Sequence, residues 1–203
     1  MRIAILVAAF CLMPLLCLAQ SGQLAPPTGW RYPMDADYTD SWKAFRNVMP
    51  IPFHVEADFN GDGLPDHAWI LFSTQDDAWG LFVFLAQEEA PPKIITLDKN
   101  AGTSKAQQMG IKLVPPGDYQ TACGKGQAVC LKDEPASLHL ELPAINYFAF
   151  EGASSFFWWD GQAEQFQRTW MDYGKQGPVK YRQGGRPRTP KSSKPSFNPH
   201  SLF

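Results

Sequence analysis

Oxygen-bearing side chains alternate along one short acidic segment of this chain. Counting from Asp58 as position 1, they stand also at positions 3, 5 and 9, with glycines between them and a backbone carbonyl at position 7. Calcium accepts roughly six to eight oxygen ligands in flexible geometry, whereas magnesium demands a strict octahedron and zinc prefers His and Cys. The sequence therefore predicts a calcium site with the ligands Asp58, Asn60, Asp62, Leu64 (through its carbonyl) and Asp66.

The alternative for this acidic loop is a solvated turn, because Asn-Gly and Asp-Gly are ordinary turn dipeptides. Three carboxylates so close together would repel one another without a cation, which favours calcium. An EF-hand would need a bidentate carboxylate at position 12 and a helix on each side of the loop. Position 12 is Trp69, inside an apolar run with the character of a strand, so an EF-hand is excluded.

The segment from Val55 to Phe72, VEADFNGDGLPDHAWILF, resembles the DxDxDGxxD loop of FG-GAP and VCBS-type repeats. In those repeats the calcium loop joins two adjacent strands of a propeller blade. The resemblance implies the same five ligands and a loop between two strands. Since the chain has no second loop of this kind, we do not expect a full propeller.

A second stretch, 152–172, together with the cysteine pair described below, resembles small bacterial exported proteins that carry one such loop. This resemblance implies a periplasmic or secreted setting and no known reaction. His54 and Glu56 alternate on one strand face and could approach Asp58, which would make an acid and base pair for a hydrolase. The chain contains no GxSxG, HExxH or glycine-rich phosphate loop, and we expect it not to be an enzyme.

Aromatic residues gather near the C-terminal strands and form a candidate binding face of Tyr147, Trp158 and Trp159. Exposed rings of this kind stack on sugars or anchor protein interfaces. The partner would be cell-wall glycan or another exported protein, including one that this domain inhibits. The alternative is that both faces of the sheet are covered, which would place these rings in the core.

Short apolar or alternating runs separated by turn residues predict strands in most of the chain. The fold class is mainly β, an antiparallel meander with one short N-terminal helix over 41–48 ended by Pro50. The expected strands cover residues 51–57, 67–73, 79–86, 93–97, 111–114, 138–142, 147–151, 155–159 and 165–170.

The first 19 residues have the form of a secretory signal peptide: Arg2 supplies the positive charge, an apolar run follows, and Ala19 is a small residue at the cleavage position. A membrane anchor and a lipoprotein are the alternatives, but the run is short for a bilayer span, and bulky residues precede Cys11 and Cys17. We therefore expect an extended lead-in over 20–35, one β-rich domain over 36–173, and no stable membrane span once the signal is removed.

Cys123 and Cys130 are the cysteines that remain after signal cleavage, so a disulfide is expected in an oxidising compartment. Metal binding and a reactive thiol are the alternatives. The tail, 174–203, carries seven Lys and Arg and no Asp or Glu, and its Pro, Gly and Ser content predicts disorder. A solvated tail is favoured over one that binds an anionic surface, and we expect no nucleic-acid partner.

Overall fold

The computed structural model describes residues 24–38, 52–102, 108–132, 134–150 and 152–174. The predicted signal peptide, the predicted helix over 41–48 and the tail from residue 175 onward lie outside the described residues.

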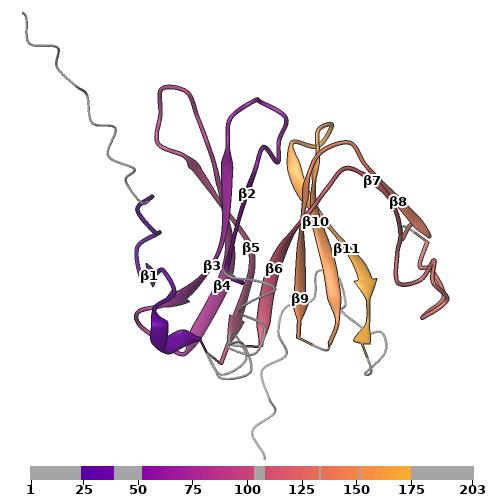
Figure 1. Cartoon of the computed structure of the whole chain (residues 1–203), viewed down its shortest axis with the longest axis horizontal. Coiled ribbons are helices and arrows are strands. Elements are labelled where there is room, and N and C mark those ends of the chain that lie inside the picture. Colours follow the sequence, from indigo (N-terminus) through magenta and orange to yellow (C-terminus); the bar gives the residue numbers. More distant parts are fainter. Residues whose placement is uncertain (1–23, 39–51, 103–107, 133, 151, 175–203) are drawn as a thin grey trace, which may run out of the picture.

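Two antiparallel sheets face each other, and a two-stranded ribbon lies beside the second sheet (Figure 1). In the first sheet the order is β1-β3-β4-β5, with β2 also paired to β3. In the second sheet the order is β11-β10-β9-β6, and the ribbon is β7-β8. The strands are β1 Trp30–Arg31, β2 His54–Ala57, β3 Asp66–Ser73, β4 Ala78–Leu85, β5 Lys93–Ala101, β6 Met109–Val114, β7 Gly117–Gln120, β8 Ser137–Leu140, β9 Ala144–Ala149, β10 Ser154–Asp160 and β11 Gln165–Asp172, and a 3-10 turn, η1, spans Asp35–Asp37.

The main core lies between the two sheets. Alternate residues of a strand point to opposite faces, so in β3 the side chains of Ala68, Ile70 and Phe72 belong to this core, as do Ile145 and Phe157 from the second sheet. Thirteen buried residues form this cluster, and nearly all their apolar surface is removed from water between the layers. The sandwich therefore depends on contacts between segments far apart in the sequence.

The first sheet is apolar on its outer face as well. Leu71, Phe82 and Phe84 point away from the main core and are covered by Trp30 and Tyr32 of the N-terminal segment. This explains why β4 is buried from Trp79 through Leu85 without the alternation expected of a strand exposed on one side.

The ribbon β7-β8 covers the outer face of the second sheet. Leu138 and Leu140 of β8 pack against Phe156 of β10 and Met171 of β11. Cys123 and Cys130 form a disulfide in the connection between β7 and β8, with their Cα atoms 4.9 Å apart, as the sequence predicts.

The two open edges of the sandwich are joined differently. At one edge the backbone N–H of Ile111 in β6 donates to the carbonyl of Pro52, just before β2, at 2.7 Å. At the other edge Arg168 of β11 lies 3.4 Å from the Asp98 carboxylate of β5 and stacks over the Trp170 ring at 4.4 Å. The hydrogen bond between Ile111 and Pro52 and the ion pair between Arg168 and Asp98 each link one sheet to the other.

The prediction of a mainly β, antiparallel fold is confirmed, and each of the expected strands overlaps an observed one. Consecutive strands form the meanders β3-β4-β5 and β9-β10-β11, and the described sheets do not form a propeller. Two short strands, β1 and β7, were not expected because their few residues show no alternation in the sequence.

An ion pair fastens the N-terminal segment that covers the first sheet. Both terminal nitrogens of Arg31 donate to the Asp37 carboxylate, at 2.6 and 3.0 Å, and the N–H of Met34 adds a third bond. Burial alone would raise the pKa of Asp37, but the hydrogen bonds from Arg31 and Met34 outweigh it and hold this pKa below its usual value of 3.8.

We expect Asp37→Asn to lower the free energy of unfolding by about 2 kcal/mol at neutral pH, since hydrogen bonds to charged groups contribute roughly 1.5–3 kcal/mol. Because the folded-state pKa is depressed, this stabilisation is complete above pH 3.8 and is lost as the pH falls through the lower folded-state pKa. Urea unfolding at a series of pH values should therefore show the difference between wild type and variant shrinking in acid. The exposed neighbour Asp35→Asn is the control, and a difference that persists unchanged in acid would contradict this assignment.

Candidate functional site

The acidic loop connects the paired strands β2 and β3 and begins immediately after the pair Ala57 and Asp66. Phe59, at the second position of the loop, is fully buried in the main core and anchors the loop there. Gly61 and Gly63 adopt φ angles of +80° and +85°, a region that side chains with a Cβ rarely enter. The expectations of a loop between two strands and of glycine-dependent turns are confirmed.

The loop carboxylates are tied to backbone N–H groups. Asp58 accepts hydrogen bonds from the N–H groups of Gly61 (2.7 Å), Asp62 (3.2 Å) and Gly63 (2.8 Å). Asp62 accepts from the N–H of Leu64 at 2.9 Å and from the amide nitrogen of Asn60 at 2.8 Å. These bonds hold the oxygen atoms on the inside of the turn.

These side chains fit calcium in part. An ionised carboxylate has about four acceptor sites, so Asp58 and Asp62 keep acceptor sites free after their hydrogen bonds are counted. Asn60 likewise uses its side-chain oxygen for one bond, from the N–H of Asp62 at 3.1 Å. The three residues lie in the accessible part of the loop and offer oxygen atoms, the ligand type that calcium prefers.

Asp66 differs from the other predicted ligands because its exposed fraction is 0 %. One carboxylate oxygen accepts the N–H of Phe59 at 2.9 Å, and the other accepts the N–H of Ala86 at 2.8 Å. Burial raises the pKa of Asp66 despite these two bonds. The residue joins the loop to the end of β4, so position 9 has a structural role of its own.

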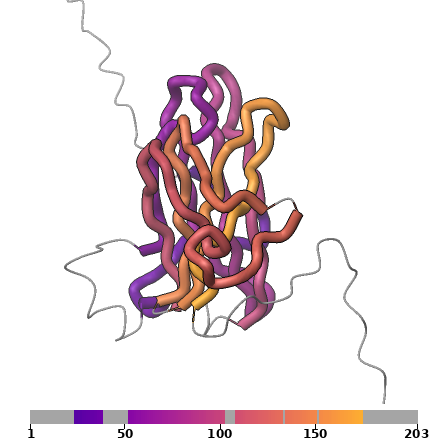
Figure 2. Tube along the Cα trace, turned by 90° about the vertical axis from the view of Figure 1, so that its right-hand side faces the viewer, coloured from indigo at the N-terminus to yellow at the C-terminus, as the bar shows by residue number. Residues whose placement is uncertain are grey.

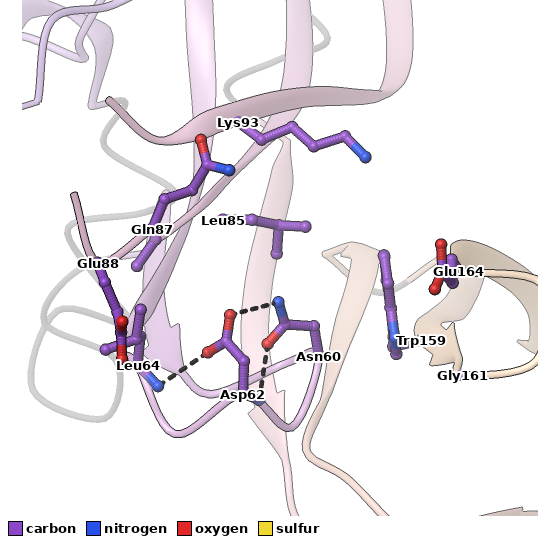
Figure 3. Close-up of a pocket in the computed structure, with 11 residues that line it drawn as sticks. Asn60, Asp62, Leu64, Leu85, Gln87, Glu88, Lys93, Trp159, Gly161 and Glu164 are labelled. Atoms are coloured by element: carbon purple, nitrogen blue, oxygen red, sulfur yellow. Dashed lines mark hydrogen bonds between the residues drawn. The ribbon is translucent and has the colours of Figure 1, made fainter. Parts of the chain in front are cut away.

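The β2-β3, β4-β5 and β10-β11 connections lie at the same end of the sandwich (Figures 1 and 2). There a groove opens between the acidic loop and the β10-β11 hairpin. Its volume is about 620 Å³. Figure 3 shows Asn60 and Asp62 on the side of the loop and Trp159 facing them from the hairpin. Three carboxylates (Asp62, Glu88 and Glu164) and one ammonium group (Lys93) line it, so the charge of the lining favours cations over anions.

The aromatic residues do not form the single face expected from the sequence. Tyr147 is 3 % exposed and belongs to the main core, so its inclusion in an exposed binding face is corrected. Trp158 packs under the ribbon β7-β8 and donates to Thr169 at 3.0 Å. Trp159 points to the opposite side, against Phe166, and is partly exposed at the rim of the groove.

A smaller groove of about 330 Å³ adjoins the first and shares Asn60, Trp159 and Gly161 with it. Trp158 lines this second groove with Leu142. The two tryptophans therefore line the same groove at the loop end of the molecule, although they are consecutive residues of β10 that point to opposite sides.

The sequence indicates that His54 and Glu56 share one strand face, but it does not indicate that His67 lies beside them. His54 and Glu56 of β2 point toward His67 of β3, with 3.1 Å between His54 Nε2 and His67 Nδ1 and 3.6 Å between Glu56 Oε2 and His67 Nδ1. Burial, and then the neighbouring His67, lower the pKa of His54. The signal in the sequence was only the placement of Glu56 and His67 on either side of the acidic loop, and the strand register then pairs them.

Comparisons with family models, with curated proteins and with solved structures return no match for this chain. The relationship to FG-GAP and VCBS-type repeats therefore stays a prediction that depends on the loop residues. Among the described residues, no helix has the length and apolar character that crossing a bilayer requires.

Asp66→Ala would leave the N–H groups of Phe59 and Ala86 without their acceptor. A buried unpaired polar group costs roughly 1–3 kcal/mol, so we expect the free energy of unfolding to fall by about 3 kcal/mol. The loss should appear in urea unfolding with a calcium chelator present, because the two bonds need no metal. The exposed Asp76→Ala in the β3-β4 connection is the control, and a loss seen only with calcium would show that Asp66 acts chiefly as a ligand.

Proposed function

We propose that this protein is an exported, non-enzymatic β-sandwich that binds calcium in the acidic loop and recognises cell-wall glycan in the groove beside it. The observation that carries the proposal is that Asn60, Asp62 and Leu64 line the same groove as Trp159. A divalent cation bound by the loop and the aromatic ring would thus both lie within reach of one ligand.

The chemistry of a sugar suits such a groove. Sugar hydroxyls can supply oxygen ligands to calcium, which takes roughly six to eight, and the apolar face of a sugar ring can lie on an indole. The carboxylates of Glu88 and Glu164 are further acceptors for hydroxyl groups. Another exported protein that inserts a side chain into this groove is the second candidate partner.

The edge-to-face contact with Phe166, at 5.2 Å, holds the Trp159 ring in place before any ligand arrives. Pre-ordered groups bind with a smaller loss of conformational entropy. The side chain of Phe59 likewise holds the loop in place from the core. The two walls of the groove are therefore each held by an aromatic residue, the buried Phe59 on the loop side and the partly buried Phe166 on the hairpin side.

Calcium should stabilise the folded chain. A ligand at about 100 times its Kd adds about 2.7 kcal/mol of stability, which for a domain of this size raises the Tm by roughly 5–10 °C. We expect Asp62→Ala to abolish the increase, because it removes an exposed loop carboxylate. Asp160→Ala, which removes an exposed carboxylate that accepts two N–H groups in the β10-β11 turn, should keep it. Identical melting curves in calcium and in chelator would remove calcium from the proposal.

Trp159→Ala tests the glycan groove separately. If the ring stacks on sugar, the variant should bind soluble cell-wall glycan fragments at least about 30-fold more weakly, corresponding to the roughly 2 kcal/mol that defines a strong interface residue. Trp30→Ala, on the outer face of the first sheet, is the matched control. Isothermal titration with calcium and with chelator measures both effects, and equal affinity of Trp159→Ala and wild type would exclude the groove as the binding site.

A further inference from the structure

Two imidazoles and one carboxylate meet on the outward face of the β2-β3 hairpin. Val55 and Ala57 of β2 pack against the main core, so the alternate residues His54 and Glu56 point to the other face. In the strand register Glu56 is opposite His67, and His54 is opposite Trp69. Among the described residues, these three are the group of His, Cys, Asp and Glu side chains whose ligand atoms all lie within 4.8 Å of one another.

Two of the three separations in this cluster are close to those around a tetrahedral metal, and the third, between His54 and Glu56, lies within 4.8 Å. Zinc binds nitrogen at about 2.0–2.1 Å and carboxylate oxygen at about 2.0–2.2 Å, so two ligand atoms of a regular tetrahedron lie roughly 3.3–3.5 Å apart. The observed separations from His67 Nδ1 are 3.1 Å to His54 Nε2 and 3.6 Å to Glu56 Oε2. Because all three ligand atoms lie within 4.8 Å of one another, a shift of the exposed Glu56 side chain would bring its oxygen closer to His54 Nε2.

The ring of His54 is held in a fixed orientation. It stacks on Trp69 with 4.0 Å between ring centroids and 24° between planes. Trp69 in turn meets the Tyr32 ring edge-on at 4.8 Å, and the Tyr32 hydroxyl donates to the carbonyl of Leu24 at 2.6 Å. Packing of this kind lowers the cost of orienting a ligand, as outer-shell contacts do in metal sites.

Solvent can reach the cluster from one side. The Glu56 side chain is 54 % exposed, while the His67 side chain is 29 % exposed. A metal bound here would therefore have three protein ligands and a position open to water, the arrangement of zinc sites that are not closed by a fourth side chain.

We propose that His54, Glu56 and His67 bind one zinc ion, at a site separate from the acidic loop. Two of the three donors are imidazole nitrogens, which suit zinc and poorly suit calcium, whose ligands are oxygens. Copper(II) binds nitrogen sites more tightly than zinc in general but favours a square-planar or tetragonal arrangement. The site lies at the base of the same hairpin whose tip carries the acidic loop, so zinc would cross-link β2 to β3.

The test uses the full chain without an affinity tag, stripped of metal and then dialysed against zinc chloride. We expect one bound zinc per chain, removable by chelator, and a rise in Tm. Glu56→Gln and His67→Gln should each weaken binding by at least the roughly 10- to 100-fold that loss of an outer-shell partner costs. His139→Gln is the matched control, because His139 also contacts a carboxylate, Asp118 at 2.7 Å, yet belongs to no three-ligand group among the described residues.

Metal-free circular dichroism and melting curves establish that each variant folds, and Glu56→Gln is the variant least able to disturb packing because Glu56 is exposed. Cobalt substitution should give the intense visible absorption of a tetrahedral centre in wild type and lose it in His67→Gln. Zinc binding should survive excess calcium and survive Asp62→Ala. Unchanged zinc affinity in both Glu56→Gln and His67→Gln would overturn the proposal, as would loss of zinc in His139→Gln alone.

Discussion

The buried carboxylate of Asp66 is the constraint on which the loop end of the molecule depends. A charged group that is buried away from water must have hydrogen-bond partners. The partners of Asp66 are the N–H groups of Phe59 in the acidic loop and of Ala86 after β4. Asp66 is the first residue of β3, so its side chain holds both the β2-β3 loop and the residue after β4 in contact with the start of that strand. The loop wall of the groove between the acidic loop and the β10-β11 hairpin is therefore held against the sheet by these bonds.

The hairpin β2-β3 separates two kinds of ligand chemistry by geometry. The oxygen atoms of Asp58, Asn60 and Asp62 lie on the inside of its turn, where Gly61 and Gly63 adopt positive φ angles. Its outward face collects nitrogen atoms, because the pleat places His54 and His67 opposite the core. Hard and borderline cations would therefore bind on the turn and on the outward face of one hairpin, respectively.

Much of the fold could be predicted because strand alternation is a local property. The runs that became β3, β10 and β11 were recognisable from apolar residues between turn residues, and the pairing of Cys123 with Cys130 followed from the number of cysteines. The separation into two sheets and a ribbon could not be predicted, since the period of two is the same whichever layer covers a face. The two-residue strand β1 is too short to show any period.

The sequence by itself determined the acidic loop, its place between two strands and the glycines it requires, because these depend on residues adjacent in the chain. Only the tertiary structure decided that Tyr147 is core, that Trp159 faces the acidic loop across a groove, and that His67 joins His54 and Glu56. Those outcomes depend on strand register and on which layer covers each face. Both are set by packing between distant segments, for which a single strand carries no signal.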